Sequence, residues 1–342
     1  MQNYPIKFKP IFKERIWGGD RLKRLFNKDL PAGKKIGESW ELADLPADCS
    51  LAAEGPWTGK TLREILEQHG KDLGFTVEQC AYPFGLLIKF LDAHDVLSVQ
   101  VHPDENARRR FKGARPKTEC WYVLEAEPGS VIYRGLKPGI GRERLEKAIT
   151  EQNVEVLMQA YPAKKSDFHF LPAGTIHALG AAVVVAEIQT PSDSTYRLYD
   201  WNRLDAQGRS RQLHIKQALA SVHYTDSPPT AEVETMETPV GIRLRQIAEN
   251  LGRARTLADG PYFSVVHLSL EQTQRREFEV PQPMVMIVLS GAGKTTNTEN
   301  PEYECFYQAG DTILVPVLRQ AGMEIAQTGE CLLASPGPVK VK

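Results

Sequence analysis

The feature that most constrains the fold is a series of short β-rich runs separated by Gly, Pro, Asp and Asn. Examples are Leu86–Leu91, Glu119–Leu124, Val131–Tyr133 and Val183–Ile188. Short runs separated by turn residues rather than by helices are typical of an antiparallel sandwich or barrel, and they argue against a parallel α/β sheet. We therefore expect a mainly β protein.

Helical periodicity is confined to a few segments. The clearest is Thr61–Gly74, where Thr58 or Thr61 could cap the first turn, and a second is Arg142–Ala160. A shorter helix is expected at Ile215–Val222. We interpret the first two as helical insertions, at about residues 58–80 and 142–162, within a β framework.

The length of 342 residues exceeds the usual size of a single hydrophobic core. Residues 225–239 are polar, contain prolines and carry few large apolar side chains, which is typical of a linker. We therefore expect one domain at residues 1–224, which would hold the active site, and a second at residues 240–342.

The second domain repeats part of the strand plan of the first. Strands are expected at Phe263–Leu270, Met284–Leu289 and Asp311–Val317. The last of these runs into Pro316, as the strand beginning at Phe168 runs into Pro172. No His or Gly follows Pro316 directly, so we predict a related β domain without metal ligands.

Four side chains form a candidate metal site. Gln100 and His102 are two residues apart, so a strand would place both on one face. Glu119 opens a run of β-formers expected to be a neighbouring strand, and His177 follows a Pro-x-Gly turn on a third. An amide oxygen, two imidazoles and a carboxylate are a ligand set for a divalent ion such as zinc.

The other histidines are weaker candidates. A single His on a half-buried strand usually has a structural role, and His102 would be assigned one without its neighbours. His169 is the nearest rival, because it lies on the strand that leads into the Pro-x-Gly turn, and we rank it below His177. The remaining five lack comparable partners: His69, His94, His214, His223 and His267.

Charge and cysteine content limit the partners and the compartment. A net charge of −1 gives no electrostatic basis for binding nucleic acid or an anionic membrane, so a small molecule is the expected partner. Five scattered cysteines without a C-x-x-C pair argue against disulfides and a thiolate zinc site. With no secretion signal in Met1–Pro10 and no stretch of transmembrane length, a cytoplasmic protein is expected.

Two basic motifs receive ordinary interpretations. Gly291–Lys294 lacks the spacing and the following helix of a phosphate-binding loop. The cluster Arg108–Arg110, with Lys112 and Arg115, is expected to be a solvated loop, and a role in drawing phosphate toward the site is a weaker hypothesis.

The order of the candidate ligands resembles the two motifs of the cupin superfamily, with Gln100 in place of the first His. The segments Ser98–Asp104, Ile188–Gln189 and Tyr196–Trp201 resemble the type I mannose-6-phosphate isomerases in their short bacterial form. The resemblance runs from Trp17 through Trp201 and less distinctly to the C-terminus. It implies a cupin-type antiparallel β-sandwich, or jelly roll, followed by a degenerate cupin-like domain.

The resemblance also implies roles for site residues. Gln100, His102, Glu119 and His177 would bind one Zn²⁺ per chain. The residues expected to contact substrate are Lys89 and Ser98 at the phosphate and Trp17 at the sugar, with Lys117, Asp193 and Arg197 near the reacting carbons. Longer members carry a His before the Lys, whereas this chain reads Arg115–Glu119 without one, so no role of that imidazole applies.

The implied reaction interconverts mannose 6-phosphate and fructose 6-phosphate through an enediol. Lys117 is the preferred base, with a pKa lowered by the dication, while a metal-bound water or Asp193 are alternatives. Arg197 is expected to donate to substrate oxygens, unless it only forms a salt bridge with Asp193 or Asp200. An iron cupin oxygenase and a non-catalytic sugar-phosphate-binding cupin are the alternative functions. We expect a monomer or homodimer.

Overall fold

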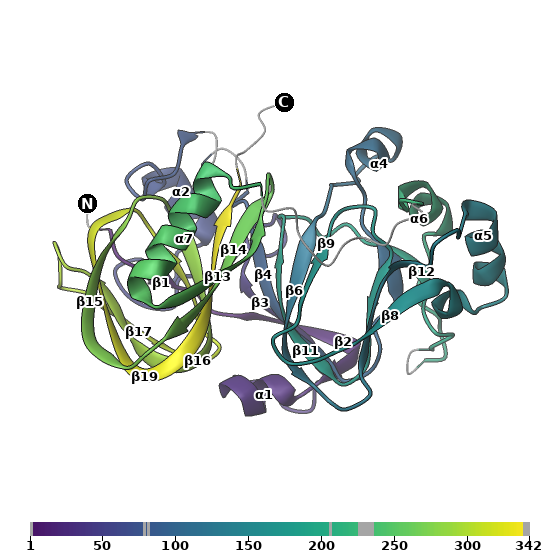
Figure 1. Cartoon of the computed structure of the whole chain (residues 1–342), viewed down its shortest axis with the longest axis horizontal. Coiled ribbons are helices and arrows are strands. Elements are labelled where there is room, and N and C mark those ends of the chain that lie inside the picture. Colours follow the sequence, from purple (N-terminus) through teal and green to yellow (C-terminus); the bar gives the residue numbers. More distant parts are fainter. Residues whose placement is uncertain (1–2, 78–79, 81–82, 205–206, 225–235, 338–342) are drawn as a thin grey trace.

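The computed structural model describes residues 3–77, 80, 83–204, 207–224 and 236–337. In this part of the chain the strands form three sheets, and every paired strand is antiparallel. The prediction of a mainly β, cupin-like fold is confirmed. Figure 1 shows two β-rich halves side by side, with most helices at their periphery.

Two of the sheets face each other to form the first sandwich. The six-stranded sheet has the order β2 (Ile11–Gly19), β3 (Ile36–Leu42), β4 (Leu87–Ala93), β11 (Val183–Gln189), β6 (Glu119–Ala126) and β9 (Phe168–Leu171). The five-stranded sheet has the order β12 (Tyr196–Tyr199), β5 (Val99–Val101), β10 (His177–Leu179), β7 (Val131–Leu136) and β8 (Met158–Pro162). Their inner faces share a core in which Trp121 and Val123 of one sheet meet Ile132 and Leu179 of the other.

The third sheet is built mainly from the C-terminal part of the chain. Its eight strands are β1 (Ile6–Lys7), β18 (Thr312–Val315), β16 (Met284–Asn297), β19 (Leu318–Pro336), β14 (Phe263–Leu270), β13 (Arg253–Asp259), β15 (Thr273–Val280) and β17 (Glu304–Gln308). The expected strand before Pro316 is present as β18, as is β9 before Pro172. Gly291–Lys294 lies within β16, which agrees with its rejection as a phosphate loop.

The helices follow local sequence signals, with some differences from expectation. Helix α2 (Leu62–His69) begins with a capping box between Thr61 and Glu64. Helix α6 (Ile215–Ser221) is where it was expected. The predicted helix at Arg142–Ala160 ends early: α5 (Arg142–Thr150) gives way to a 3₁₀ turn, η1 (Val154–Leu157), and then to β8.

Within the described residues, three helices were not predicted. Helix α1 (Arg21–Phe26) follows β2, and α4 (Glu105–Arg110) begins where the Asp104 side chain accepts a hydrogen bond from the Ala107 amide. The Arg108–Arg110 cluster is solvent-exposed, as expected, but it lies on α4 and not in a loop. Helix α7 (Pro239–Leu251) begins at the last residue of the predicted linker, after a Thr238 cap and with Pro at its start.

The hydrophobic core joins the two halves of the chain. One buried cluster contains Ile6 and Phe8 near the N-terminus, Phe90 and Ile188 of the six-stranded sheet, and Leu314 of the C-terminal sheet. The pairing of β1 with β18 places the N-terminal residues in the C-terminal sheet. The division at residues 1–224 and 240–342 stays a prediction, and residues 225–235 of the proposed linker lie outside the described residues.

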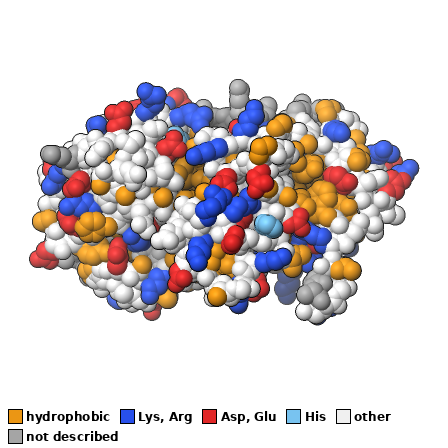
Figure 2. All heavy atoms as spheres, turned by 90° about the horizontal axis from the view of Figure 1, so that it is seen from below, with side chains coloured by type: hydrophobic (Ala, Val, Ile, Leu, Met, Phe, Trp, Pro, Cys, Tyr) orange, Lys and Arg blue, Asp and Glu red, His pale blue; other side chains and the backbone are white. Residues whose placement is uncertain are grey.

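The surface shows no segregation of charge on the face seen from below. Figure 2 shows Lys and Arg side chains interspersed with Asp and Glu across the middle of that face. Among the described residues, no helix has the length and apolarity needed to cross a membrane.

Candidate active site

The site lies between the two sheets of the first sandwich. Gln100 on β5 is in register with His177 on β10, so adjacent strands place both side chains on one face. His102 follows the end of β5 two residues after Gln100. Glu119 begins β6, which is a strand of the opposite sheet rather than a neighbour of β5, so its carboxylate reaches the group from across the sandwich.

The predicted ligand atoms converge. Nε2 of His102 lies 3.2 Å from Oε2 of Glu119, and Nε2 of His177 lies 3.3 Å from Oε1. The amide nitrogen of Gln100, not the oxygen predicted as a ligand, lies 3.2 Å from the same His177 nitrogen, so binding a metal through the oxygen requires the opposite orientation of this amide. The ligand atoms of His102, Glu119 and His177 all lie within 4.8 Å of one another, and these three are the one group of this kind among the described residues.

The surroundings hold both imidazoles in the tautomer that a metal needs. Nδ1 of His102 lies 3.0 Å from the Ser194 carbonyl, and Nδ1 of His177 lies 2.9 Å from the Thr175 carbonyl. Because a carbonyl only accepts, each Nδ1 donates its proton and each Nε2 keeps a lone pair. Nε2 of His102 and Oε1 of Glu119 are buried without a hydrogen-bond partner, and Oε2 of Glu119 has an ion-pair contact with Lys117, which fits ligand atoms arranged around a cation.

The protonation states also fit a metal site. Burial, with a smaller effect from the Lys117 ammonium, lowers the pKa of His102 to about 3, and burial lowers the pKa of His177. Burial acts to raise the pKa of Glu119, but the Lys117 ammonium acts in the opposite direction, and the pKa is held well below its usual value. The set is therefore two neutral imidazoles and one carboxylate, the forms that bind a divalent ion.

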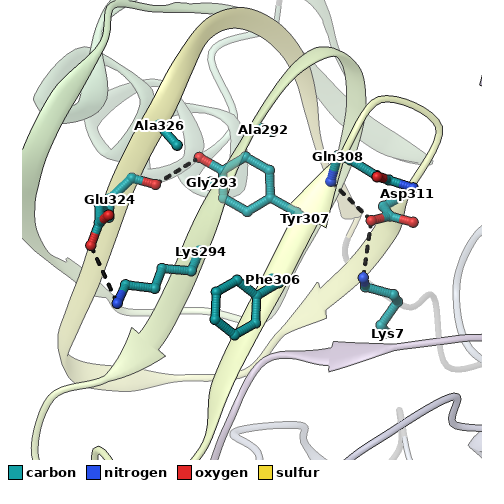
Figure 3. Close-up of a pocket in the computed structure, with 10 residues that line it drawn as sticks. All are labelled: Lys7, Ala292, Gly293, Lys294, Phe306, Tyr307, Gln308, Asp311, Glu324 and Ala326. Atoms are coloured by element: carbon teal, nitrogen blue, oxygen red, sulfur yellow. Dashed lines mark hydrogen bonds and ion pairs between the residues drawn. The ribbon is translucent and has the colours of Figure 1, made fainter.

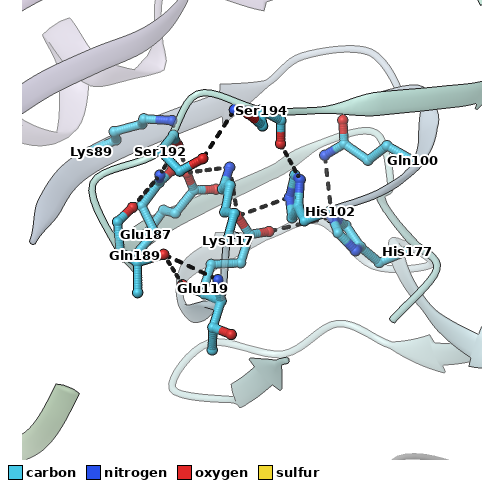
Figure 4. A network of polar contacts seen from close by, with 12 residues as sticks. Lys89, Gln100, His102, Lys117, Glu119, His177, Glu187, Gln189, Ser192 and Ser194 are labelled. Carbon is cyan, nitrogen blue, oxygen red and sulfur yellow. Dashed lines mark hydrogen bonds and ion pairs between the residues drawn. The ribbon is translucent and has the colours of Figure 1, made fainter. Parts of the chain in front are cut away.

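A buried charge network adjoins the ligands, as Figure 4 shows. Nζ of Lys117 lies 2.8 Å from Oε2 of Glu119 and 3.8 Å from Oε1 of Glu187. Glu187 also lies 3.0 Å from Nζ of Lys89 and accepts a 2.9 Å hydrogen bond from the Trp121 indole. Glu187 was missed from sequence, although a single acid within the apolar strand β11 was a usable signal.

Lys117 differs from expectation in its electrostatics. Burial acts to lower its pKa, but the nearby Glu119 and Glu187 carboxylates outweigh burial and raise the pKa above the usual value for lysine. The lowered pKa of Lys117 that we predicted from the sequence was based only on the charge of the metal ion. The carboxylates that surround Lys117 act in the opposite direction and favour the ammonium form.

A cavity of about 430 Å³ opens beside this network. Of the predicted site residues it is lined by Trp17, Lys89, Ser98, Gln100, Lys117, Asp193 and Arg197. The structure therefore brings the predicted substrate-contacting residues to one cavity, which adjoins the metal-binding group through Gln100 and Lys117. The cavity also exposes Arg15, Glu38 and Arg211, which were not predicted from the sequence.

Arg197 does not take part in the salt bridges considered as its alternative role. Asp200 is paired with Arg203 and Arg211. In the described part of the chain Arg197 has no ion pair, and its Nη1 donates a 2.8 Å hydrogen bond to the Gln212 carbonyl. Its guanidinium therefore remains available at the cavity wall.

The rival histidine lies elsewhere in the sandwich. His169 on β9 pairs with Trp121 in register, is buried, and is not part of the ligand group. Neither of its ring nitrogens has a hydrogen-bond partner. Ranking His169 below His177 as a ligand is consistent with this placement.

A second cavity, of about 310 Å³, lies on the C-terminal sheet (Figure 3). Its charged side chains are satisfied by one another, with Lys7 lying 3.0 Å from Asp311 and Lys294 lying 3.3 Å from Glu324. The metal-binding group of the described residues belongs to the first sandwich. The geometry therefore favours the 430 Å³ cavity as the active site.

Known proteins resemble this chain over nearly its whole length. The family model described as phosphomannose isomerase type I, catalytic domain, matches residues 6–130. A mannose-6-phosphate isomerase of Streptococcus mutans is 34% identical over 85% of this chain and 87% of its own length, and one of Bacillus subtilis is 35% identical over 92% and 94%.

Solved structures agree with the sequence relatives. The crystal structure of mannose 6-phosphate isomerase from Bacillus subtilis superposes with a TM-score of 0.82 at 29% identity, covering 97% of this chain and 100% of that one. A Salmonella typhimurium phosphomannose isomerase variant, at 15% identity and a TM-score of 0.73, shares the fold. Given relatives above 30% identity over most of their length, the chain belongs to the type I phosphomannose isomerase family.

Proposed function

We propose that the protein is a metal-dependent aldose–ketose isomerase that interconverts D-mannose 6-phosphate and D-fructose 6-phosphate. The observation that carries the proposal is the buried His102–Glu119–His177 group, which lies beside a cavity rich in cationic side chains and contacts Gln100 and Lys117 of its lining. The family relationship supplies the substrate, because the curated relatives are named for it.

The proposed cofactor is one Zn²⁺ held by His102, Glu119 and His177, with the Gln100 amide as a fourth ligand. A bound divalent ion would act as a Lewis acid that stabilises negative charge developing on the substrate oxygens. The donor set supports this role, because one carboxylate leaves net positive charge on a site holding a divalent cation. The absence of thiolates among these donors also suits an ion that must remain electrophilic.

The reaction moves a proton from C2 of the aldose to C1, through an enediol, while the oxygens exchange a hydroxyl proton. Lys117 and Asp193 are the proposed proton-transferring groups, because both line the cavity. Arg197 is proposed as a permanent positive donor to substrate oxygens, since its guanidinium has no carboxylate partner in the described chain. Trp17 would border the sugar, and Lys89 and Ser98 would contact its phosphate.

The test is a coupled assay for fructose 6-phosphate formed from mannose 6-phosphate by the zinc-loaded protein. Glu119→Gln and His177→Ala should lose both metal and turnover, whereas Lys117→Met should retain metal and lose turnover. Glu125→Gln is the matched control, because Glu125 lies on the same strand but pairs with Arg24 at the surface. Metal-free His177→Ala protein with full activity would refute the proposal.

Further measurements on the same purified protein distinguish the alternative functions. Tight binding of mannose 6-phosphate without turnover would favour a non-catalytic sugar-phosphate-binding protein. Oxygen consumption that depends on Fe²⁺ would favour a cupin oxygenase. Exchange of the C2 proton with solvent deuterium, measured in Lys117→Met and Asp193→Asn, identifies which of the two residues moves the proton.

A further inference from the structure

Helix α6 packs against the outer face of the strands that carry two of the proposed metal ligands. Val101 follows Gln100 on β5, and Ile176 directly precedes His177. Neighbouring residues of an extended chain point to opposite faces, so both apolar side chains face away from the metal-binding group. They belong to one buried cluster with Val222, the residue that follows α6. The end of α6 is therefore anchored behind the ligands.

His223, the next residue, lies over the turn that leads to His177. A Cβ added to Gly174 in this turn would lie only 2.6 Å from three atoms of the His223 ring. The backbone N–H of His223 donates a 2.9 Å hydrogen bond to the Gly174 carbonyl. Gly174 has a φ of +87°, so the missing side chain serves both the turn and the close approach of the ring.

The same ring reaches the segment that follows His102. Nε2 of His223 lies 3.1 Å from Oδ2 of Asp104. Because a carboxylate oxygen only accepts, Nε2 is the donor. The other oxygen of Asp104 accepts a hydrogen bond from the Ala107 amide at the start of α4, which lies beside α6 (Figure 1). No partner for His223 was predicted from the sequence.

Backbone hydrogen bonds join the same segments from within. The Gly174 N–H donates a 3.0 Å hydrogen bond to the His102 carbonyl. The carbonyl of the residue after His102 accepts a 3.1 Å hydrogen bond from the amide of Lys117. The segments of His102, Lys117 and His177 are therefore bonded to one another, and His223 adds contacts to two of them from outside.

We propose that His223 is a positioning residue that holds the His102 and His177 segments together and thereby slows loss of the metal ion. It is neither a proposed ligand nor part of the cavity lining, and it acts through Asp104 and Gly174. A group bonded directly to a ligand changes metal affinity by about 10- to 100-fold, and His223 is one contact further away, so its effect should be smaller. The inference rests on the proposed metal site.

The first test measures amide hydrogen exchange in metal-free, full-length protein at one pH. In His223→Ala the amides of Gly174 and Lys117 should exchange about three- to tenfold faster than in wild type, because a partly exposed pair and its packing are lost. Slowly exchanging amides of the eight-stranded sheet should not change, which separates local loosening from global destabilisation. His223→Gln should be close to wild type, because its side-chain amide can donate in place of Nε2.

The second test measures the release of zinc from loaded protein to an excess of a chromogenic chelator. Release should be about three- to tenfold faster in His223→Ala. Asp104→Ser should show a similar rise, because serine can still cap α4 but leaves no carboxylate for His223. The double variant should release zinc about as fast as the faster single variant, because both substitutions remove the same contact.

Arg142→Ala is the matched control, because its side chain is 54% exposed, as is that of His223, and it pairs with Glu146 on α5, which carries no ligand. Its amide exchange and zinc release should stay within about twofold of wild type. Unchanged exchange or unchanged zinc release in His223→Ala, or an equal rise in Arg142→Ala, would overturn the inference. If wild type binds no zinc, the proposed cofactor fails, and amide exchange in the metal-free protein still decides whether His223 holds the two segments together.

Discussion

Replacing His169 by leucine should remove a specific part of the acid sensitivity of the fold. His169 is buried on β9, with no hydrogen-bond partner for either ring nitrogen. Burial, with a smaller contribution from the nearby Arg134 guanidinium and partial opposition from Asp167, lowers its pKa from 6.5 to about 4. Between these two values the unfolded chain binds a proton that the folded protein does not.

The sign and size follow from that difference. A depressed histidine pKa means that stability is lost as pH falls below 6.5 and is lost in full below about 4. Relative to pH 7, the loss at pH 5 is about 2 kcal/mol for a shift from 6.5 to about 4. His169→Leu should lack this loss, because leucine does not titrate.

Urea denaturation of wild type and His169→Leu at pH 7 and pH 5 measures the effect. Both proteins are kept metal-free with a chelator, so that protonation of the metal ligands contributes equally and cancels in the comparison. The free energy of unfolding of wild type should fall by about 2 kcal/mol more than that of the variant. Parallel pH dependence in the two proteins would refute the reasoning that His169 is buried in its neutral form.

Further predictions follow from other contacts. Glu187→Gln should lower turnover and reduce stability by about 1.5–3 kcal/mol in thermal unfolding, because it removes the carboxylate from a buried, charged hydrogen bond. Thr61→Ala should cost about 1 kcal/mol in the same assay, because the α2 capping box is lost. Gly74→Ala should destabilise more than Gly59→Ala: both have positive φ, but the added Cβ of Gly74 would lie 2.1 Å from Val317, whereas Gly59 faces open space. A chelator should lower the melting temperature of the zinc-loaded wild type but not that of Glu119→Gln.

Part of the ligand group could be predicted because the spacing of two ligands along one strand decides which face they share. Gln100 and His102 share a face through the two-residue period of a strand, and this needs no knowledge of the rest of the fold. The sheet that carries Glu119 was not predictable in this way. Which strands pair is decided by contacts far apart in sequence, and β6 pairs with β9 and β11 rather than with β5.

The missed residues share a physical cause. Arg15, Glu38 and Arg211 look like ordinary surface residues in sequence. Arg15 on β2 and Glu38 on β3 reach the cavity through the pairing of the six-stranded sheet, and Arg211 reaches it from the segment between β12 and α6. The early end of α5 has a similar origin. Apolar residues continue at helical spacing beyond Thr150, but the chain instead forms β8, whose pairing with β7 overrides the local preference.

The pairing of Ile6 with Leu314 joins the first strand of the chain to one of the last. A ribosome adding about 5–20 residues per second would need about 15–60 s to produce that partner after the first strand has been made. During that interval the apolar side chains of Ile6 and Phe8 have no finished sheet to cover them. Assembly of the C-terminal sheet is therefore a late event in synthesis, and a chain that stops before β18 leaves its earliest residues exposed to chaperones and proteases.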